Sequence, residues 1–439
     1  MTRGRILLIS YYFAPQNVMG AVRPTKLAKY LTRLGWEVTV LCGAGMPGPA
    51  DPTLARDMAG LHDVRVMREW NPLRDYKARQ AGGGASGGGG EARPARQGFK
   101  HRAADAVYQY LRWLADRSFG RQARRELTRL RGPFDAVISS YGPYSVHEVA
   151  ARAKRMGLAA RWIADFRDEA DVPFAWQRVR LGRYLRGIRR EADVLSAVSQ
   201  GFLEMMGFED VGRVLSNGFD PEELVAPEPR EEPRRLRVAY VGQMIDGRRN
   251  LPDRDLTPAF SAFAALIREG ALRREELELV YAGGQAHLFL ACAKAAGLED
   301  RVLNLGRVPR ERSIAIQRSA DVLLMASFHT SRQRGILTGK LFEYLMINRP
   351  ILCCVAGDLT GSGVRQVLLE TGAGLCHEQA GGAADDAALL AWLSDLASRW
   401  RAGRPLTEGR DAGAVERYAY PALAQTLSDW LDEPCVTKL

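Results

Sequence analysis

The chain has 439 residues, of which 46% are hydrophobic and 26% are charged. This composition is typical of a globular protein with two or three domains, and it excludes a disordered chain. Lys and Arg outnumber Asp and Glu by 62 to 51, and the net charge of +11 favours anionic partners without selecting one kind.

Short apolar runs that predict strands alternate with helical patterns along almost the whole chain. Most of these runs are short and continuous, are rich in Val, Ile, Leu and Ala, and are bounded by Gly, Pro or polar residues, which is typical of strands buried on both faces. The predicted strands are residues 5–10, 37–42, 64–68, 135–140, 161–166, 193–199, 236–242, 277–282, 302–305, 321–326 and 350–355. Alternating strands and helices predict parallel sheets with helices on both faces.

One stretch, residues 221–233, is rich in Pro and charge and has almost nothing to bury, so it predicts an interdomain linker. We therefore expect an α/β protein of two doubly wound, Rossmann-like lobes that face each other across a cleft, because ligands of this class bind beyond the carboxyl ends of the strands. The expected parts are residues 1–220, a linker at 221–235, residues 236–412, and C-terminal helices at 413–439 that pack back toward the N-terminal lobe.

Three segments of the N-terminal lobe differ from this pattern. Residues 81–98 begin with a glycine-rich run and predict a flexible insertion. Residues 99–131 are basic with interleaved aromatic side chains, and residues 178–190 carry six arginines and no acid, with apolar residues on one helical face. Each basic stretch has two open interpretations: a surface helix packed on its own lobe, or a contact with an anionic membrane surface.

No apolar run approaches the ~20 residues that span a bilayer, and the N-terminus enters a strand-like run without the apolar core of a signal peptide. The six cysteines form neither a C-x-x-C motif nor the framework of a small disulfide-rich domain. We therefore expect a cytoplasmic, reduced protein.

Asp253 and Asp255 resemble a D-x-D metal motif, but they lie in a polar stretch beside a proline, and we expect no metal.

The strongest candidate site is the stretch 334–344, which opens a predicted helix between two predicted strands. Thr338, Gly339 and Lys340 would bring backbone N–H groups, a hydroxyl and an ammonium together at the helix N-terminus, and this combination suits a diphosphate. Glu343 follows one turn later and could accept both hydroxyls of a ribose. The alternative is a capped helix with a Lys–Glu pair on its surface.

Two further stretches follow predicted strands of the N-terminal lobe. Gly20 lies just before a predicted helix, where a ligand can approach free N–H groups, although there is no G-x-G-x-x-G fingerprint and an ordinary turn is the alternative. Asp165-Phe-Arg-Asp168 follows a buried strand, and both of its charged ends could face the cleft. Asp168 could bind or deprotonate an acceptor hydroxyl and Arg167 could pair with a phosphate; the alternative is a salt-bridged loop.

Together these stretches resemble glycosyltransferase family 4, which has the two-lobed GT-B fold, and in particular its bacterial polysaccharide-assembly members. The matching stretches are residues 6–15 (ILLISYYFAP), 139–147 (SSYGPYSVH), 164–168 (ADFRD), 216–220 (SNGFD), 240–243 (YVGQ) with 247–249 (GRR), and 335–344 (GILTGKLFEY). They follow one another in order over most of the chain.

The resemblance implies roles for individual residues. Gly20 would border the donor phosphate, and Arg248 and Arg249 would bind the donor diphosphate, although the arginine that usually follows the strand's glycine is Gln243 here. Of the family's two glutamates, the ribose-binding one matches Glu343. The other, which is associated with the transferred sugar, falls on Gly335 and is missing.

The family also has a histidine that contacts the sugar. By position it would fall near Tyr141 in this sequence. His147 is close in the sequence and is the candidate, with a structural role in the following helix as the alternative.

The resemblance thus implies a retaining glycosyltransferase that moves a sugar from a nucleotide-diphosphate sugar, bound by the C-terminal lobe, to a hydroxyl of a glycan or lipid-linked acceptor, bound by the N-terminal lobe. The nucleotide sugar is a substrate, so no cofactor is expected.

The basic stretches suggest peripheral binding to the inner face of the cell membrane. The alternatives are a nucleotide-sugar epimerase of the same architecture and a non-catalytic membrane or nucleic-acid binding protein. No nucleic-acid module is recognisable, so nucleic acid is not an expected partner.

Overall fold

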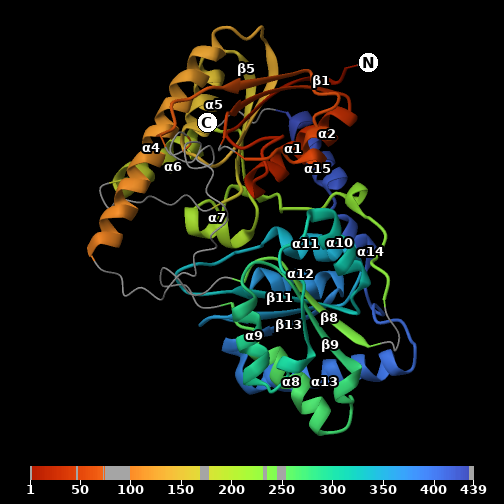
Figure 1. Ribbon diagram of the computed structural model, residues 1–439. Coiled ribbons are helices and arrows are strands. Elements are labelled where there is room, and N and C mark those ends of the chain that lie inside the picture. The colour runs from red at the N-terminus through yellow and green to blue at the C-terminus, as the bar shows by residue number, and fades with distance from the viewer. Residues whose placement is uncertain are drawn as a thin grey trace. The chain divides into compact units, whose positions relative to one another are not determined.

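The computed structural model of the chain describes residues 2–45, 48–72, 74, 99–168, 177–230, 235–244 and 254–434 (Figure 1). The chain divides into two domains, and each is built on one parallel sheet. The first domain comprises Met1–Val198, Leu203–Leu215 and Leu423–Leu439, and the second comprises Ser199–Phe202 and Ser216–Ala422. The glycine-rich insertion at 81–98 lies outside the described residues, as do Arg248 and Arg249.

The sheet of the first domain has the strand order β3-β2-β1-β4-β5-β6-β7. Its strands are β1 (Gly4–Ser10), β2 (Trp36–Gly43), β3 (Asp63–Met67), β4 (Phe134–Ser140), β5 (Ala159–Phe166), β6 (Val194–Ala197) and β7 (Gly212–Val214). All neighbouring strands are parallel, with Ile6 opposite both Val38 of β2 and Ala136 of β4. The strand order therefore reverses between β1 and β4, where a doubly wound sheet opens a crevice beyond its carboxyl ends.

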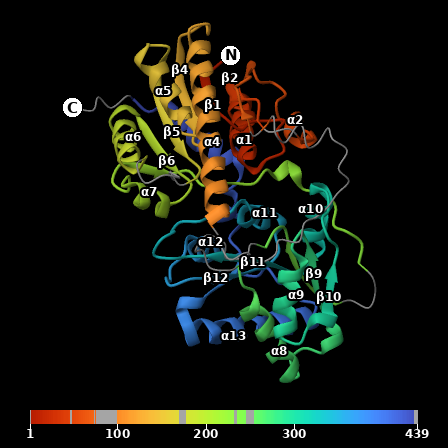
Figure 2. The same ribbon diagram turned by 60° about the vertical axis from the view of Figure 1, so that its left-hand side comes forward.

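Helices cover both faces of this sheet (Figures 1 and 2). They are α1 (Met19–Arg33), α2 (Pro52–Arg56), α4 (Phe99–Leu127), α5 (Ser145–Arg155), α6 (Gln177–Glu191), α7 (Gln200–Met206) and α15 (Tyr420–Asp432). Ile138 of β4 lines the same interior gap as Leu27 of α1 and Leu427 of α15. Ser139, the next residue, bonds to His147 of α5. Because side chains alternate along a strand, α5 lies on the opposite face from α1 and α15.

The second sheet has the order β10-β9-β8-β11-β12-β13, again entirely parallel. Its strands are β8 (Leu236–Val241), β9 (Leu277–Ala282), β10 (Val302–Asn304), β11 (Val322–Phe328), β12 (Ile351–Ala356) and β13 (Gly374–Glu378). The order repeats that of the first six strands of the first domain. The reversal lies between β8 and β11, so a second crevice is expected there.

Two apolar clusters fill the two faces of the second sheet. One packs α8 (Thr257–Arg268), α9 (Ala286–Ala295) and α13 (Gly382–Arg401) against it. The other packs α10 (Arg310–Ser319), α11 (Gly339–Ile347), α12 (Gly363–Thr371) and α14 (Ala412–Glu416). The single turns η1 (Pro221–Glu223), η3 (Arg274–Glu276), η4 (Glu299–Arg301) and η5 (Gln379–Gly381) complete the described elements of this domain.

The predicted fold class, two doubly wound α/β domains, is confirmed. Each of the eleven predicted strands is present, with bounds that differ by a few residues. Sequence analysis missed β7 and β13. The first has only three residues, and the second ends in His377 and Glu378, so neither is a continuous apolar run.

The segment expected to be the linker lies along the second domain in its described part. The Glu228 N–H donates to the Ala315 carbonyl of α10 at 3.1 Å, and the Arg318 side chain donates to the Val225 carbonyl.

At the other end of the chain, Trp36 Nε1 donates to Ser428 Oγ at 2.8 Å and ties α15 to the first domain. Among the described helices, none is long and apolar enough to cross a membrane.

Candidate functional site

The crevice of the second domain has the N-terminus of α11 beside the end of β8. Thr338 is the extended N-cap residue, and its side chain makes no capping hydrogen bond. The Val241 N–H donates to Tyr344 Oη at 3.2 Å, which holds α11 against β8. The free N–H groups of the first helical turn and the helix dipole favour an anion at this position.

Lys340 projects from this turn onto the aromatic face of Tyr240. Its Nζ lies 3.7 Å from the centroid of the ring. Although the residue as a whole is partly exposed, Nζ is buried and has no hydrogen-bond partner among the described residues. Gly242 adopts φ +118°, and a Cβ on it would lie 3.1 Å from Nζ, so the backbone at Gly242 lies close to the lysine.

Arg254 is a second cation at this place, and sequence analysis missed it. It lies three residues before the start of α8 and hydrogen-bonds to the side chain of Tyr240, whose ring carries Lys340. Burial, together with the nearby charge of Arg254, lowers the pKa of Lys340 to about 7. Two neighbouring cations without a carboxylate between them form an anion site. Nothing in the sequence ranks Arg254 above Arg248 and Arg249 of the same loop.

The adjacent acid, Asp255, has a structural role. Its carboxylate accepts a hydrogen bond from the Thr257 N–H at 2.8 Å, at the first residue of α8. Asp253, its partner in the D-x-D pattern, lies outside the described residues.

Glu343 lies on α11 and bonds to α10 rather than to Lys340. Arg310 Nη1 donates to its carboxylate at 3.0 Å, and Gln317 Nε2 donates at 2.5 Å. The alternative interpretation, a Lys–Glu pair on the helix surface, is therefore wrong: the ammonium is buried on an aromatic ring and the carboxylate bonds elsewhere.

Gly335, which the family resemblance matches to a glutamate, is confined by the backbone around it. It adopts φ +73°, a conformation that side chains rarely tolerate. A Cβ would lie 2.5 Å from Ser199 Oγ and 2.8 Å from Gly201 Cα, and the Ser199 hydroxyl donates to the Gly335 carbonyl at 2.6 Å. A glutamate side chain therefore has no room here unless the loop moves.

In the first domain, three loops meet on the guanidinium of Arg167. Its Nε donates to the Tyr141 carbonyl at 2.6 Å, after β4. A Cβ on Gly20, in the first turn of α1, would lie 2.4 Å from Arg167 Nη1, and one on Gly142 would lie 2.9 Å from Nη2. Asp168 is exposed, with its Oδ2 at 3.6 Å from Nη2. The structure thus brings Gly20, Arg167 and Asp168 together beside the reversal of the strand order.

Asp165 does not belong to this group, so the expectation that both charged ends of this stretch face the cleft is wrong for Asp165. Its carboxylate is buried and accepts from Arg23 Nη2 at 2.9 Å and Nε at 3.1 Å, and from Ser196 Oγ at 2.9 Å. The acid therefore fixes α1 to the sheet.

His147 lies in the interior on α5, which favours the structural alternative. Its Nδ1 is 2.7 Å from Ser139 Oγ, and its ring packs against Phe166 with a centroid distance of 4.6 Å. The residue has no exposed surface, and burial lowers its pKa to about 3. Tyr141, the other position considered, is also buried. A substrate cannot reach His147 without opening this core.

The basic helix α6 turns its apolar face to its own domain. Tyr184 Oη donates to the Tyr144 carbonyl at 2.9 Å, Ile188 is buried, and Arg183 and Arg186 are exposed. Of the two interpretations of the 178–190 stretch, the packed surface helix is therefore the observed one.

The middle of α4 exposes the aromatic residues of the other basic stretch. Tyr108 and Tyr110 are exposed, Tyr110 stacks on Trp113 at 5.7 Å, and the guanidinium of Arg117 lies 5.1 Å from the Trp113 ring centroid. Phe119, further along the helix, is buried.

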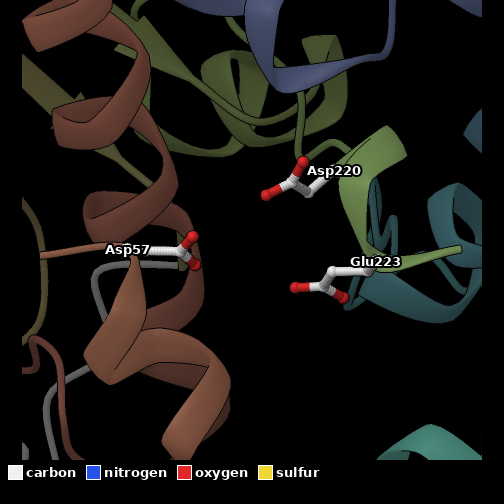
Figure 3. Close-up of side chains that lie close together, drawn as sticks. All are labelled: Asp57, Asp220 and Glu223. Carbon is white, nitrogen blue, oxygen red and sulfur yellow. The ribbon is translucent and has the colours of Figure 1, made fainter. Parts of the chain in front are cut away.

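Figure 3 shows three further acidic side chains, and each has a structural partner in its own domain. Asp57 pairs with Lys26 at 2.6 Å and with Lys29 at 2.9 Å. Asp220 caps η1 by accepting from the Glu222 N–H at 3.1 Å. Glu223 pairs with Arg310. These contacts account for the three carboxylates, and we assign them no metal.

Comparison with known proteins identifies the fold. No family model matches the chain, and no curated protein sequence matches it. Among solved structures it is similar to sucrose-phosphate synthase from Thermosynechococcus elongatus (14% identity, 98% of both chains covered, TM-score 0.57). It is also similar to the N-terminal domain of trehalose-6-phosphate phosphatase from Candida albicans (14% identity, 98% of this chain and 96% of that one, TM-score 0.60).

A third similar structure is the lipopolysaccharide outer core galactosyltransferase WaaB (13% identity, 97% of this chain and 98% of that one, TM-score 0.51). At these identities the similarity establishes a shared fold of two Rossmann-like domains over nearly the whole chain.

Proposed function

We propose that the protein is a glycosyltransferase that takes a sugar from a nucleotide-diphosphate donor bound by the second domain. The observation that carries the proposal is the buried Nζ of Lys340, which lies near Arg254 at the N-terminus of α11 and has no hydrogen-bond partner among the described residues. Such a site suits a diphosphate, because its charge would be met by two cations and by the N–H groups of the helix. One of the similar structures is itself named a galactosyltransferase.

Glu343 is the proposed ribose-binding residue. Its carboxylate lies one turn from Lys340 and is oriented by two donors on α10, Arg310 and Gln317. Arg248 and Arg249 of the loop after β8 remain proposed diphosphate ligands together with Thr338 and Gly339. The leaving diphosphate would be stabilised as its charge develops, which is the main catalytic contribution a site of this kind can make.

Arg167 and Asp168 are proposed to serve the acceptor, with Gly20 allowing close approach. Arg167 is held by the Tyr141 carbonyl, so its terminal nitrogens can be presented to an anionic group. The exposed Asp168 can bind the acceptor hydroxyl by accepting a hydrogen bond from it. We propose a retaining mechanism without a protein nucleophile, in which the leaving phosphate takes the acceptor's proton. His147 is buried and is not assigned a contact with substrate.

Donor binding is tested by calorimetric titration of the full chain with UDP, GDP and their sugar esters. Lys340→Ala and Glu343→Ala should each weaken binding at least tenfold, since each removes a charged or charge-assisted contact. The matched controls are Lys294→Ala on α9 and Glu311→Ala on α10, both exposed, which should bind as the wild type does. Wild-type affinity in both Lys340→Ala and Glu343→Ala would refute the assignment of this site.

Product analysis separates transfer from epimerisation. A transferase needs an acceptor and releases the nucleoside diphosphate, whereas an epimerase returns an intact nucleotide sugar with a changed sugar. Release of an epimerised nucleotide sugar without any acceptor would overturn the proposal.

We also propose that the acceptor is a glycan or lipid-linked intermediate and that the protein binds peripherally to the cytoplasmic membrane surface through the aromatic and basic residues of α4. Flotation with anionic liposomes at low salt should recover the wild type. Arg117→Glu should reduce recovery, whereas Arg268→Glu, an equal charge change at an exposed residue of α8, should not. Equal recovery of the two variants, or none of the wild type, would contradict membrane binding by α4.

A further inference from the structure

The surroundings of Lys340 raise a question that diphosphate binding alone does not answer. An ammonium has three N–H donors, yet Nζ is enclosed by the ring of Tyr240 on one side and by Gly242 on the other. Among the described residues none accepts a hydrogen bond from it. A charged group held in this way lacks the solvation that would normally stabilise it.

The neighbouring charged and titratable groups do not compensate for this burial. Arg254, before α8, adds a like charge. Glu343, on α11 itself, is the one carboxylate among the groups acting on Lys340, and its oxygens already accept from α10. Cys353 of β12 is buried, and burial raises the pKa of its thiol well above the ordinary value, so it carries no charge at neutral pH.

We propose that a large share of the free protein molecules hold Lys340 uncharged on the ring of Tyr240 at neutral pH, and that these molecules take up a proton when a nucleotide diphosphate binds. Tyr240 is then a positioning residue that holds the lysine beneath Gly242 until the anion arrives. This inference rests on the proposed function, because it names the same site as the place where the donor binds.

The position of Tyr240 suits this task. The side chain is fully buried, its hydroxyl donates to the Gln243 carbonyl at 3.0 Å, and its ring stacks on Tyr281 with centroids 6.0 Å apart. The ring therefore cannot turn away from Lys340. An aromatic face attracts an ammonium but offers it no acceptor, so it stabilises the charge less than water or a phosphate would.

The proton balance follows from the pKa of about 7 that burial and Arg254 give the free lysine. At pH 8 about nine-tenths of the molecules would hold neutral Lys340, and at pH 6 about one-tenth. A bound diphosphate raises the pKa by direct contact with its negative oxygens. Binding at pH 8 should therefore take up about 0.9 proton from the buffer, and affinity should be about tenfold weaker at pH 8 than at pH 6.

Calorimetry of the full chain in two buffers of different ionisation enthalpy measures this uptake. The probes are UDP-glucose and GDP-mannose, diphosphate diesters whose phosphates do not titrate between pH 6 and 8. Wild type should show about 0.9 proton at pH 8 and about 0.1 at pH 6. Lys340→Met should bind more weakly and take up none. Tyr240→Phe, which keeps the ring face, should retain the profile.

Tyr240→Leu removes the ring face and should move the uptake curve to lower pH, a change that loss of packing alone would not produce. Binding without proton uptake at pH 8, or equal uptake in wild type and Lys340→Met, would overturn the inference and leave the proposed function intact. If neither these esters nor UDP and GDP bind at any pH, the proposed function itself fails.

Discussion

The interior position of His147 leads to a prediction about pH that separates a structural role from a catalytic one. Burial in an apolar, aromatic surrounding lowers the pKa of His147 from 6.5 in the unfolded chain to about 3 in the folded one. A histidine with a lowered folded pKa contributes stability above its unfolded pKa, and this contribution is lost as the pH falls through 6.5 toward 3. Between pH 7.5 and pH 5 the loss should be about 2 kcal/mol.

The assay is hydrogen exchange of the amides of β4 and β5 at pH 7.5 and pH 5, which reports the opening free energy of this domain without assuming that both domains unfold together. Because other groups also titrate in this interval, the quantity of interest is the difference between wild type and His147→Phe. The variant should lose about 2 kcal/mol less between the two pH values.

His287→Phe, which changes an exposed histidine on α9, is the matched control and should follow the wild type. An equal pH dependence in wild type and His147→Phe would refute the reasoning. A variant of unchanged stability and greatly reduced turnover would instead indicate the contact with substrate that its burial argues against.

Three other substitutions test the remaining assignments. Asp165→Asn leaves a buried guanidinium without its counter-charge and should destabilise the first domain by about 3–5 kcal/mol in urea unfolding; a loss below about 1 kcal/mol would contradict the buried pair. Gly335→Glu introduces the glutamate of the family pattern at a left-handed position without space for it, so it should lower the melting temperature and give no faster transfer; a stable, faster variant would show that the loop can adapt. Gly20→Ala should displace the Arg167 guanidinium and reduce turnover severalfold, whereas Gly187→Ala on α6, where a Cβ meets nothing within 4 Å, should not; equal turnover would remove Arg167 from the site.

Most of the fold could be predicted because buried parallel strands have a strong local signal. Continuous apolar runs located eleven strands, and the alternation with helices gave the class. The strand order was not predictable from these runs, since register and neighbours depend on contacts between segments far apart in the sequence. The path of residues 221–230 was not predictable either, because a charged, Pro-rich stretch can follow a surface as well as span a gap.

The site was predictable in kind and only partly in detail. The stretch 334–344 identified the N-terminus of α11 and Lys340, because a lysine at a helix start is a local pattern. Whether its ammonium pairs with Glu343 or rests on an aromatic ring depends on β8, a hundred residues earlier in the chain. The same limit applies to Arg254, which only becomes distinct from Arg248 and Arg249 through its bond to Tyr240.

In each domain a glycine lies close to a basic side chain. This shared arrangement supports the interpretation of both positions as binding sites. In the first domain Gly20 and Gly142 allow the backbone to approach the guanidinium of Arg167, and in the second Gly242 lies close to the side chain of Lys340. Each arrangement lies beside the reversal of the strand order: Gly20 and Gly142 follow β1 and β4, and Gly242 follows β8. A basic side chain enclosed by backbone gains little stability from burial. It gains a fixed position, which is an advantage when the side chain must meet an anion that binds later.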